Sequence, residues 1–235
     1  MQQPHLGLIV PPAAGAVPVD GPLLYGDRIR FSARGLGLGE ISTRGYTEVI
    51  DSVIDKALEL KADGVSAVSL MGTSLSFFRG AAFNRQLEVE MASATGLPCS
   101  TMSNAIVNGL RSLGIRRVAV ATAYIDEVNT QLRLYLAQSD FEPLALEGLS
   151  ISDVQKVGEV PTQVLVDLCV KVFEAQPGAD GILISCGGLV TLDAVREVEA
   201  RLQVPVVSSS PAGFWDLVRT AGLDARSPGQ GRLFA

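Results

Sequence analysis

The sequence predicts an α/β protein built from two similar lobes, each with a parallel β-sheet and helices on both faces of the sheet. Short apolar runs alternate with segments of helical periodicity along the chain, and such alternation is typical of parallel sheets covered by helices. The second half of the chain also repeats features of the first half. These observations predict lobes related by a pseudo-two-fold axis, with the functional site in the cleft between them.

Six strands are expected from short apolar, β-branched runs, at residues 6–10, 67–71, 98–101, 117–122, 181–185 and 204–208. Amphipathic helices are expected between them, at residues 43–61, 104–113, 125–137, 162–175 and 191–202. Ser210 and Pro211 are expected to begin a further helix, because serine is a preferred N-cap and proline fits the first helical position.

The internal repeat pairs two strand ends. ADGVSAVSLMGTSL, from Ala62, resembles ADGILISCGGL, from Ala179, so that residues 72–74 lie opposite residues 186–188. LPCSTMSN resembles VPVVSSSP, and LGLIVPP resembles VAVATAY; the alternative is chance similarity between two βαβ units. We expect one lobe to comprise residues 1–114 with a C-terminal segment of residues 208–235, and the other lobe residues 115–207.

The composition describes a globular protein with a large core, because 47% of the residues are hydrophobic and 19% are charged. A net charge of −6 argues against a nucleic-acid partner. No apolar run reaches the roughly 18 residues that a membrane span requires. The opening MQQPHLGLIVPP lacks the pattern of a signal peptide, so we expect a monomer in the cytoplasm that contacts neither membrane nor nucleic acid.

The histidine and cysteine content argues against several kinds of catalytic and metal site. The only histidine, His5, is expected in a mobile N-terminal tail, which excludes Ser-His-Asp and Cys-His arrangements and histidine-based zinc sites from the core. Three cysteines without a C-x-x-C motif argue against disulfides and against a metal site. Cys99 and Cys169 lie in apolar patterns and are interpreted as buried, inert thiols.

The third cysteine, Cys186, ends an apolar strand in LISCGGL and is followed by two glycines that allow a ligand to approach the backbone. It is either a small buried hydrophobe or a reactive group. No histidine or lysine lies near it in the sequence to lower its pKa, so the thiol is expected to stay protonated. A catalytic Cys186 would therefore act as a proton donor more readily than as a nucleophile.

Three other motifs leave alternatives open. In MGTSLSF, Thr73 or Ser74 either caps a helix or helps to form an anion cradle of hydroxyl and amide groups. Tyr124 at the end of RVAVATAY either packs in the core or donates to a bound carboxylate. GLGLGE lacks the spacing of a dinucleotide-binding loop and is interpreted as an ordinary loop.

The two-lobed repeat with a thiol at a strand end resembles the aspartate/glutamate racemase superfamily, whose members use two facing cysteines as acid and base. This chain has only the second cysteine, because Gly72 occupies the first position. That glycine, together with MGTSLSF, SCGGL, IVPPAAG, GLGLG and SSSPAGFWD, is similar to the arylmalonate decarboxylases.

The resemblance implies two Rossmann-like lobes and a carboxy-lyase that needs no cofactor or metal. Its small-molecule substrate would be an α-aryl malonate, converted through an enediolate to one enantiomer of a 2-arylcarboxylate. Cys186 would donate the proton, and a dioxyanion hole would be formed by Thr73, Ser74, Tyr124 and Gly187. The substrate pocket would be lined by Gly72, Leu38, Ile41, Leu75, Val154, Val157, Pro11, Pro12 and Gly188.

Two alternatives remain at this point. One is a racemase of amino acids or hydantoins, or an enzyme like maleate isomerase, and Gly72 argues against it because two-base chemistry needs an acid on both faces of the substrate. The other is a non-catalytic carboxylate-binding protein in which Cys186 has no chemical role.

Overall fold

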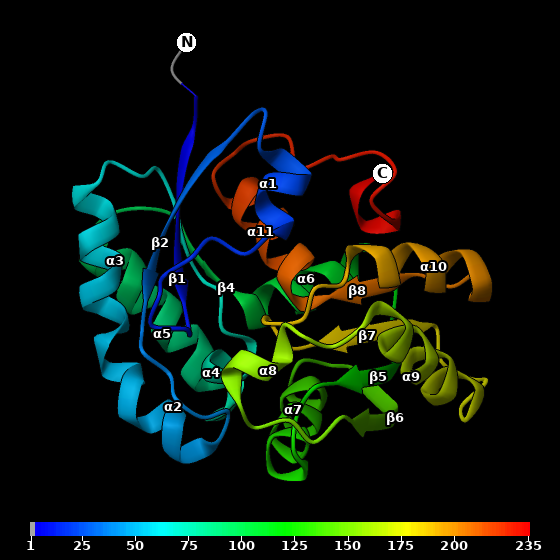
Figure 1. Ribbon diagram of the computed structural model, residues 1–235. Coiled ribbons are helices and arrows are strands. Elements are labelled where there is room, and N and C mark those ends of the chain that lie inside the picture. The colour runs from blue at the N-terminus through cyan, green and yellow to red at the C-terminus, as the bar shows by residue number, and fades with distance from the viewer. Residues whose placement is uncertain (1–2) are drawn as a thin grey trace.

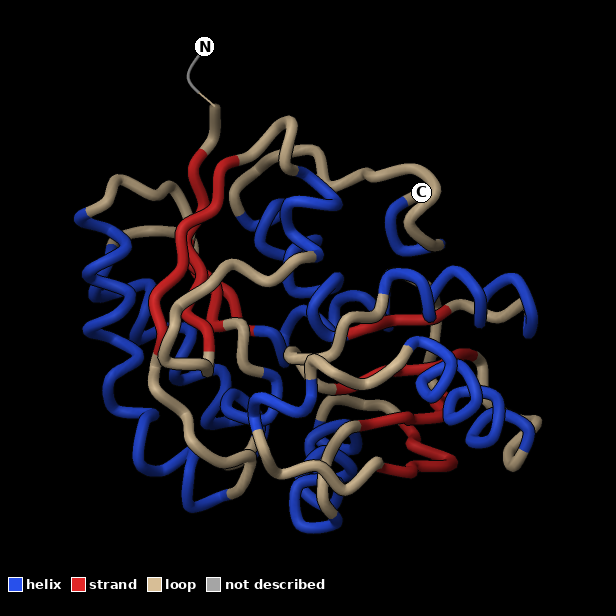
Figure 2. Tube along the Cα trace, in the orientation of Figure 1, coloured by secondary structure: helices blue, strands red, loops and turns tan. Residues whose placement is uncertain are grey.

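The protein contains two four-stranded sheets in which all neighbouring strands run parallel (Figures 1 and 2). The computed structural model describes residues 3–235. The first sheet has the order β2 (Arg30–Gly35), β1 (His5–Val10), β3 (Val68–Leu70) and β4 (Cys99–Thr101). The second has the equivalent order β6 (Glu142–Gly148), β5 (Arg117–Thr122), β7 (Gly181–Ser185) and β8 (Val206–Ser208). The predicted α/β class with parallel sheets is confirmed.

Helices cover both sheets, as the blue segments of Figure 2 show. The first half of the chain contributes α1 (Asp20–Tyr25), α2 (Thr43–Val49), η1 (Ile50–Ser52), α3 (Val53–Ala62), α4 (Thr73–Phe77), α5 (Gly80–Thr95) and α6 (Met102–Ser112). The second half contributes α7 (Asp126–Gln138), α8 (Val154–Val157), α9 (Thr162–Glu174), α10 (Leu192–Leu202), α11 (Ser209–Thr220) and η2 (Arg232–Phe234). None of the helices within residues 3–235 is long and apolar enough to cross a membrane.

The six strands expected from the sequence are all present, and β5 and β7 have the expected bounds. The edge strands β2 and β6 were missed. Their sequences, RFSARG and EPLALEG, carry charged residues or proline, and they are only partly buried. Parallel strands that are buried on both faces give continuous apolar runs. This holds for the central strands and for the fully buried edge strands β4 and β8, but not for the half-exposed β2 and β6.

Three local expectations are corrected by the structure. His5 lies at the start of β1, where its ring contacts Arg30 and Ser32, and not in a mobile tail. The helix expected at residues 43–61 is interrupted by η1. The last long helix, α11, begins at Ser209 with Ser208 as N-cap, so Ser210 lies inside its first turn.

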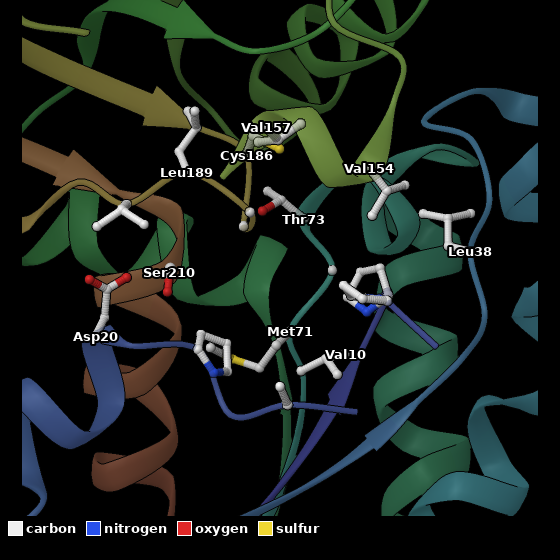
Figure 3. Close-up of a pocket in the computed structure, with 18 of the residues that line it drawn as sticks. Val10, Asp20, Leu38, Met71, Thr73, Val154, Val157, Cys186, Leu189 and Ser210 are labelled. Atoms are coloured by element: carbon white, nitrogen blue, oxygen red, sulfur yellow. The ribbon is translucent and has the colours of Figure 1, made fainter. Parts of the chain in front are cut away.

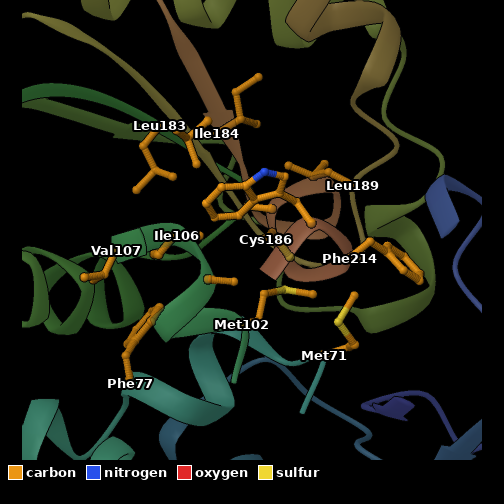
Figure 4. Packing of buried hydrophobic residues seen from close by; sticks show 14 of the residues in the cluster. Met71, Phe77, Met102, Ile106, Val107, Leu183, Ile184, Cys186, Leu189 and Phe214 are labelled. Carbon is orange, nitrogen blue, oxygen red and sulfur yellow. The ribbon is translucent and has the colours of Figure 1, made fainter. Parts of the chain in front are cut away.

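Helix α11 returns to the first sheet, where it packs on α6, α1 and β4. Gly213 in α11 lies close to Met71, because a Cβ there would be 2.8 Å from Sδ of Met71, so a larger residue would displace that side chain. Met71 and Met102 belong to the same apolar cluster as Cys186 and Phe214 (Figure 4). The core therefore continues from one sheet to the other directly behind the loops that follow β3 and β7. The lobe boundaries themselves stay a prediction.

Candidate active site

A cavity of about 260 Å³ lies where the loops after β1, β3 and β7 meet (Figure 3). Parallel strands bring their carboxyl ends to one edge of a sheet, so residues that follow different strands come together. Twelve of the residues expected in the site line this cavity: Pro11, Pro12, Leu38, Ile41, Gly72, Thr73, Ser74, Val154, Val157, Cys186, Gly187 and Gly188. The two ends paired by the sequence repeat therefore share one cavity.

Cys186 follows the last residue of β7, and its side chain is 6% exposed. Burial raises the pKa of the thiol to about 11 because the thiolate would be poorly solvated. Hydrogen bonding from the Gly188 amide, and then from Tyr124 and the Leu189 amide, opposes this rise without overcoming it. The group is a thiol at neutral pH and has a proton to give.

The loop after β3 is held by two buried serines. Ser76 Oγ donates to the carbonyl oxygens of Gly72 and Thr73 at 3.0 and 2.9 Å, and Ser103 Oγ donates to the Thr73 carbonyl at 2.9 Å. The two hydroxyls are 2.6 Å apart. These bonds fix the peptide planes of the loop, and hence the direction of its amide groups.

Helix α4 starts within this loop, and its N-cap is Gly72, which has no side chain to cap the helix. The interpretation of Thr73 or Ser74 as the cap is therefore wrong. Both side chains line the cavity, and the Thr73 hydroxyl lies 2.8 Å from Sδ of Met102. The uncapped first turn offers hydroxyl and amide donors to an anion.

Gly72 faces the same cavity, and its φ of −128° is available to any residue. A Cβ at this position would lie 3.1 Å from Cβ of Leu75 and 3.2 Å from Cγ of Pro11. The glycine therefore reflects limited space and not an unusual backbone conformation.

The apolar end of the cavity is closed by two segments from different halves of the chain. Leu38 and Ile41 follow β2, and Val154 and Val157 form part of α8. The Ile41 amide donates to the Ser152 carbonyl at 2.8 Å, beside an antiparallel bridge between Glu40 and Asp153. This backbone pairing holds four aliphatic side chains around one end of the cavity.

Two expected residues do not line the cavity. Tyr124 is fully buried, accepts a hydrogen bond from Ser185 Oγ at 3.4 Å and contributes a hydrogen bond to Cys186. It is therefore placed to orient the thiol. Leu75 is 1% exposed and packs behind Gly72.

Comparisons with known proteins agree over the full length of the chain. The family model described as arylmalonate decarboxylase matches residues 6–234. Arylmalonate decarboxylase from Bordetella bronchiseptica is 60% identical over 238 residues, which cover 100% of this chain and 99% of that protein. The chain belongs to the arylmalonate decarboxylase family.

Solved structures and a more distant relative extend the comparison. A double mutant of arylmalonate decarboxylase, solved in a liganded form, has a TM-score of 0.97 at 60% identity, with 99% of each chain covered. Maleate isomerase from Nocardia farcinica is 25% identical over 97% of this chain and 94% of the relative. The maleate isomerase Iso from Pseudomonas putida S16 shares the fold, with a TM-score of 0.93 at 23% identity over 99% of this chain and 98% of that chain.

Several lining residues of this arylmalonate decarboxylase family member were not found from the sequence. They are Val10, Ala16, Val17, Pro18, Val19, Asp20, Met71, Leu189, Val190 and Ser210. Tyr46, which lies beside Ser74, was also missed. The segments IVPPAAG and SSSPAGFWD, noted in the sequence, contain Val10 and Ser210. Residues 16–20 have no periodic pattern that could have indicated them. Within residues 3–235, Asp20 is the only charged residue in the lining, and no lysine, arginine or histidine lines the cavity.

The raised pKa of Cys186 predicts slow alkylation at neutral pH. The thiolate is the reacting form, so the rate with iodoacetamide should rise about tenfold per pH unit between pH 7 and 9. Mass spectrometry of the peptide that contains Cys186 distinguishes it from Cys99 and Cys169. Tyr124→Phe should slow the reaction at each pH, because it removes a hydrogen bond that lowers the thiol pKa. A rate that levels off below pH 9 would contradict the assignment.

Proposed function

We propose that the protein decarboxylates α-aryl malonates without a cofactor and releases a single enantiomer of the 2-arylcarboxylate. The observation that carries this proposal is the protonated Cys186 thiol, which shares a cavity with Gly72. Family membership supports the decarboxylation, and the geometry supports the assignment of roles. The proposal also takes the protein to be a monomer in the cytoplasm.

One substrate carboxylate binds among the donors of the loops after β3 and β7. Thr73 and Ser74 supply hydroxyl groups, and Gly187 supplies a backbone amide. The loop is already fixed by Ser76 and Ser103. Donors held in position before the reaction stabilise developing charge without the cost of reorganisation.

The second carboxylate lies against the aliphatic end of the cavity formed by Leu38, Ile41, Val154 and Val157. These side chains offer no hydrogen bond, so an ion there is poorly solvated. Cleavage of the bond between this carboxylate and the α-carbon releases neutral CO₂ and removes the unfavourable charge. The electron pair passes into an enediolate, whose charge the bound carboxylate oxygens share with the donors around them.

Protonation completes the reaction. Cys186 Sγ transfers its proton to the α-carbon, and the resulting thiolate regains a proton from water because its pKa of about 11 favours the thiol at neutral pH. Gly72 carries no acid, so only the face of the intermediate toward Cys186 receives a proton. A single product configuration follows.

Removal of the thiol should abolish turnover. Cys186→Ala is expected to lower the rate of CO₂ release from methyl(phenyl)malonate by about 10²- to 10⁴-fold, the range for loss of a general acid. The measurement uses chelator-treated buffer, with circular dichroism to verify the fold. Near-normal activity in this variant would show that another group protonates the intermediate.

A second thiol at the position of Gly72 should lower the enantiomeric purity of the 2-arylcarboxylate product. In Gly72→Cys, Leu75 and Pro11 must move by a few tenths of an ångström, after which acids lie on both faces of the α-carbon. We expect slower decarboxylation and racemisation of enantiopure 2-phenylpropionate, followed by chiral chromatography. Gly72→Ser is the matched control, because its hydroxyl is too weak an acid to racemise the product. Retention of configuration in the cysteine variant would refute the facing arrangement.

The Thr73 hydroxyl should contribute mainly to kcat. Thr73→Val keeps the shape of the side chain and removes one donor, and we expect kcat to fall about 10²- to 10³-fold. Thr73→Ser restores the donor and should recover most of the rate. An unchanged kcat in the valine variant would place the hydroxyl outside the anion site.

A further inference from the structure

Asp20 is the one lining residue that the proposed reaction does not use. Its side chain is 1% exposed, and Oδ1 has no hydrogen-bond partner among residues 3–235. Burial raises the pKa of this carboxyl to about 6, while hydrogen bonding from the Ser210 hydroxyl opposes the rise. A buried carboxyl group with an unused acceptor is costly to keep, so its presence in a cavity wall calls for a ligand.

The position of Asp20 in the cavity identifies what it faces. Figure 3 shows Asp20 and Ser210 at one end, below Leu189, and Leu38 and Val154 at the other end, with Cys186 and Thr73 between them. The aliphatic end is assigned to the departing carboxylate, and the centre to the α-carbon and the bound carboxylate. The aryl group is left with the end at which Asp20 lies.

That end is otherwise apolar. Leu189 lies there, and the lining residues next to Asp20 or Leu189 in the chain are also apolar: Val17, Pro18, Val19 and Val190. Apolar walls fit the faces of an aromatic ring, and a few well-placed polar groups in such a pocket fix orientation and specificity. The Asp20 and Ser210 side chains are the polar groups of this end.

A structural explanation accounts for Asp20 only in part. It is the first residue of α1, where a carboxylate is favoured by the helix dipole, but this helix has six residues and no side-chain cap. No lysine or arginine pairs with the carboxyl group in the described chain. A well-packed amide or apolar residue would fill the place at lower cost.

We propose that Asp20 selects α-aryl malonates whose ring carries an O–H or N–H donor, such as a hydroxyphenyl group, by accepting a hydrogen bond from that donor. The inference rests on the proposed function and names the substrate class of the same site. The Ser210 hydroxyl lies beside the carboxyl group and has no well-formed hydrogen bond within the described residues, so it is available to the same ring substituent. An unsubstituted ring leaves the buried acceptor unpaired, and this is how a polar pocket rejects an apolar analogue.

The same charge orients the substrate. A malonate is a dianion, and Asp20 repels it because no cation of the described lining lies between them. The carboxylates therefore bind at the end away from Asp20, and a ring with an acidic substituent is excluded.

The test compares kcat/KM for methyl(3-hydroxyphenyl)malonate and methyl(4-hydroxyphenyl)malonate with the two corresponding methoxy compounds, which match them in position but lack the donor. We expect a preference for the hydroxyl compound of about 10- to 100-fold at one ring position, the size of a hydrogen bond to a charged group. Asp20→Leu should abolish this preference, and Asp20→Asn should reduce it while keeping a neutral acceptor.

Asp216→Asn is the matched control. Asp216 is also a buried carboxyl, and it lies on α11 outside the cavity, bonded to Ser100 and Asn108. Its substitution should leave the ratio of the two kcat/KM values unchanged. The melting temperature should rise in Asp20→Asn, because an unpaired buried carboxyl is removed, and fall in Asp216→Asn, because a bonded one is lost.

The outcomes separate this inference from the proposed function. Equal kcat/KM values for hydroxyl and methoxy compounds at both positions, or a preference that survives in Asp20→Leu, would overturn the role of Asp20 while decarboxylation stands. Absence of CO₂ from every compound would refute the proposed function. Calorimetric binding of 2-(hydroxyphenyl)propionates against their methoxy analogues then tests Asp20 alone, with the same expected preference and the same loss in Asp20→Leu.

Discussion

The chemistry of this protein depends on a largely apolar cavity that offers no positive charge. None of the described lining residues is a lysine, an arginine or a histidine. An anion must therefore be held by neutral N–H and O–H groups, which act more strongly there than in water. The same surroundings keep the Cys186 thiol protonated, because burial leaves its thiolate poorly solvated and no cation in the described lining compensates. The absence of positive charge therefore has two consequences. The anion site depends on well-placed neutral donors, and Cys186 keeps the proton that it donates.

The donors of the anion site must be held in fixed positions, and the two sheets supply the rigid support. The strands β1, β3 and β7 are fully buried, so each has a single register that fixes the loop after it. Ser76 and Ser103 then fix the carbonyl groups of the loop after β3. The sheets have equivalent strand orders, but one strand end carries Cys186 and the other Gly72. A nearly symmetric backbone therefore presents a thiol on one side only, and the proposed handedness of the product rests on that difference.

The central strands and the two facing strand ends were predictable from the sequence because a fully buried parallel strand leaves a continuous apolar run, and the repeat aligned residues 72–74 with 186–188. The edge strands β2 and β6 were not, because their half-exposed positions carry charges and proline. Ser208, Ser209 and Ser210 are all acceptable N-caps, so composition could not choose the helix start. Asp20 was missed because residues 16–20 have no recognisable sequence pattern. Only the fold brings them to the cavity, beside the loop that follows β7.

Three of the six buried side-chain atoms that lack a hydrogen-bond partner in the described chain lie at or beside the cavity, and the other three belong to Ser69, Gln131 and Ser209. Asp20 Oδ1, the Tyr46 hydroxyl and Ser210 Oγ are buried without a well-formed hydrogen bond within the described residues. Asp20 and Ser210 line the cavity, and Tyr46 lies beside Ser74. Each such group costs about 1–3 kcal/mol of stability. The continuous core of this protein offsets that loss of stability. A polar group that is unpaired in the free protein can still form a hydrogen bond with a ligand. Asp20 and Ser210, which line the cavity, are therefore the unsatisfied groups that a substrate could contact.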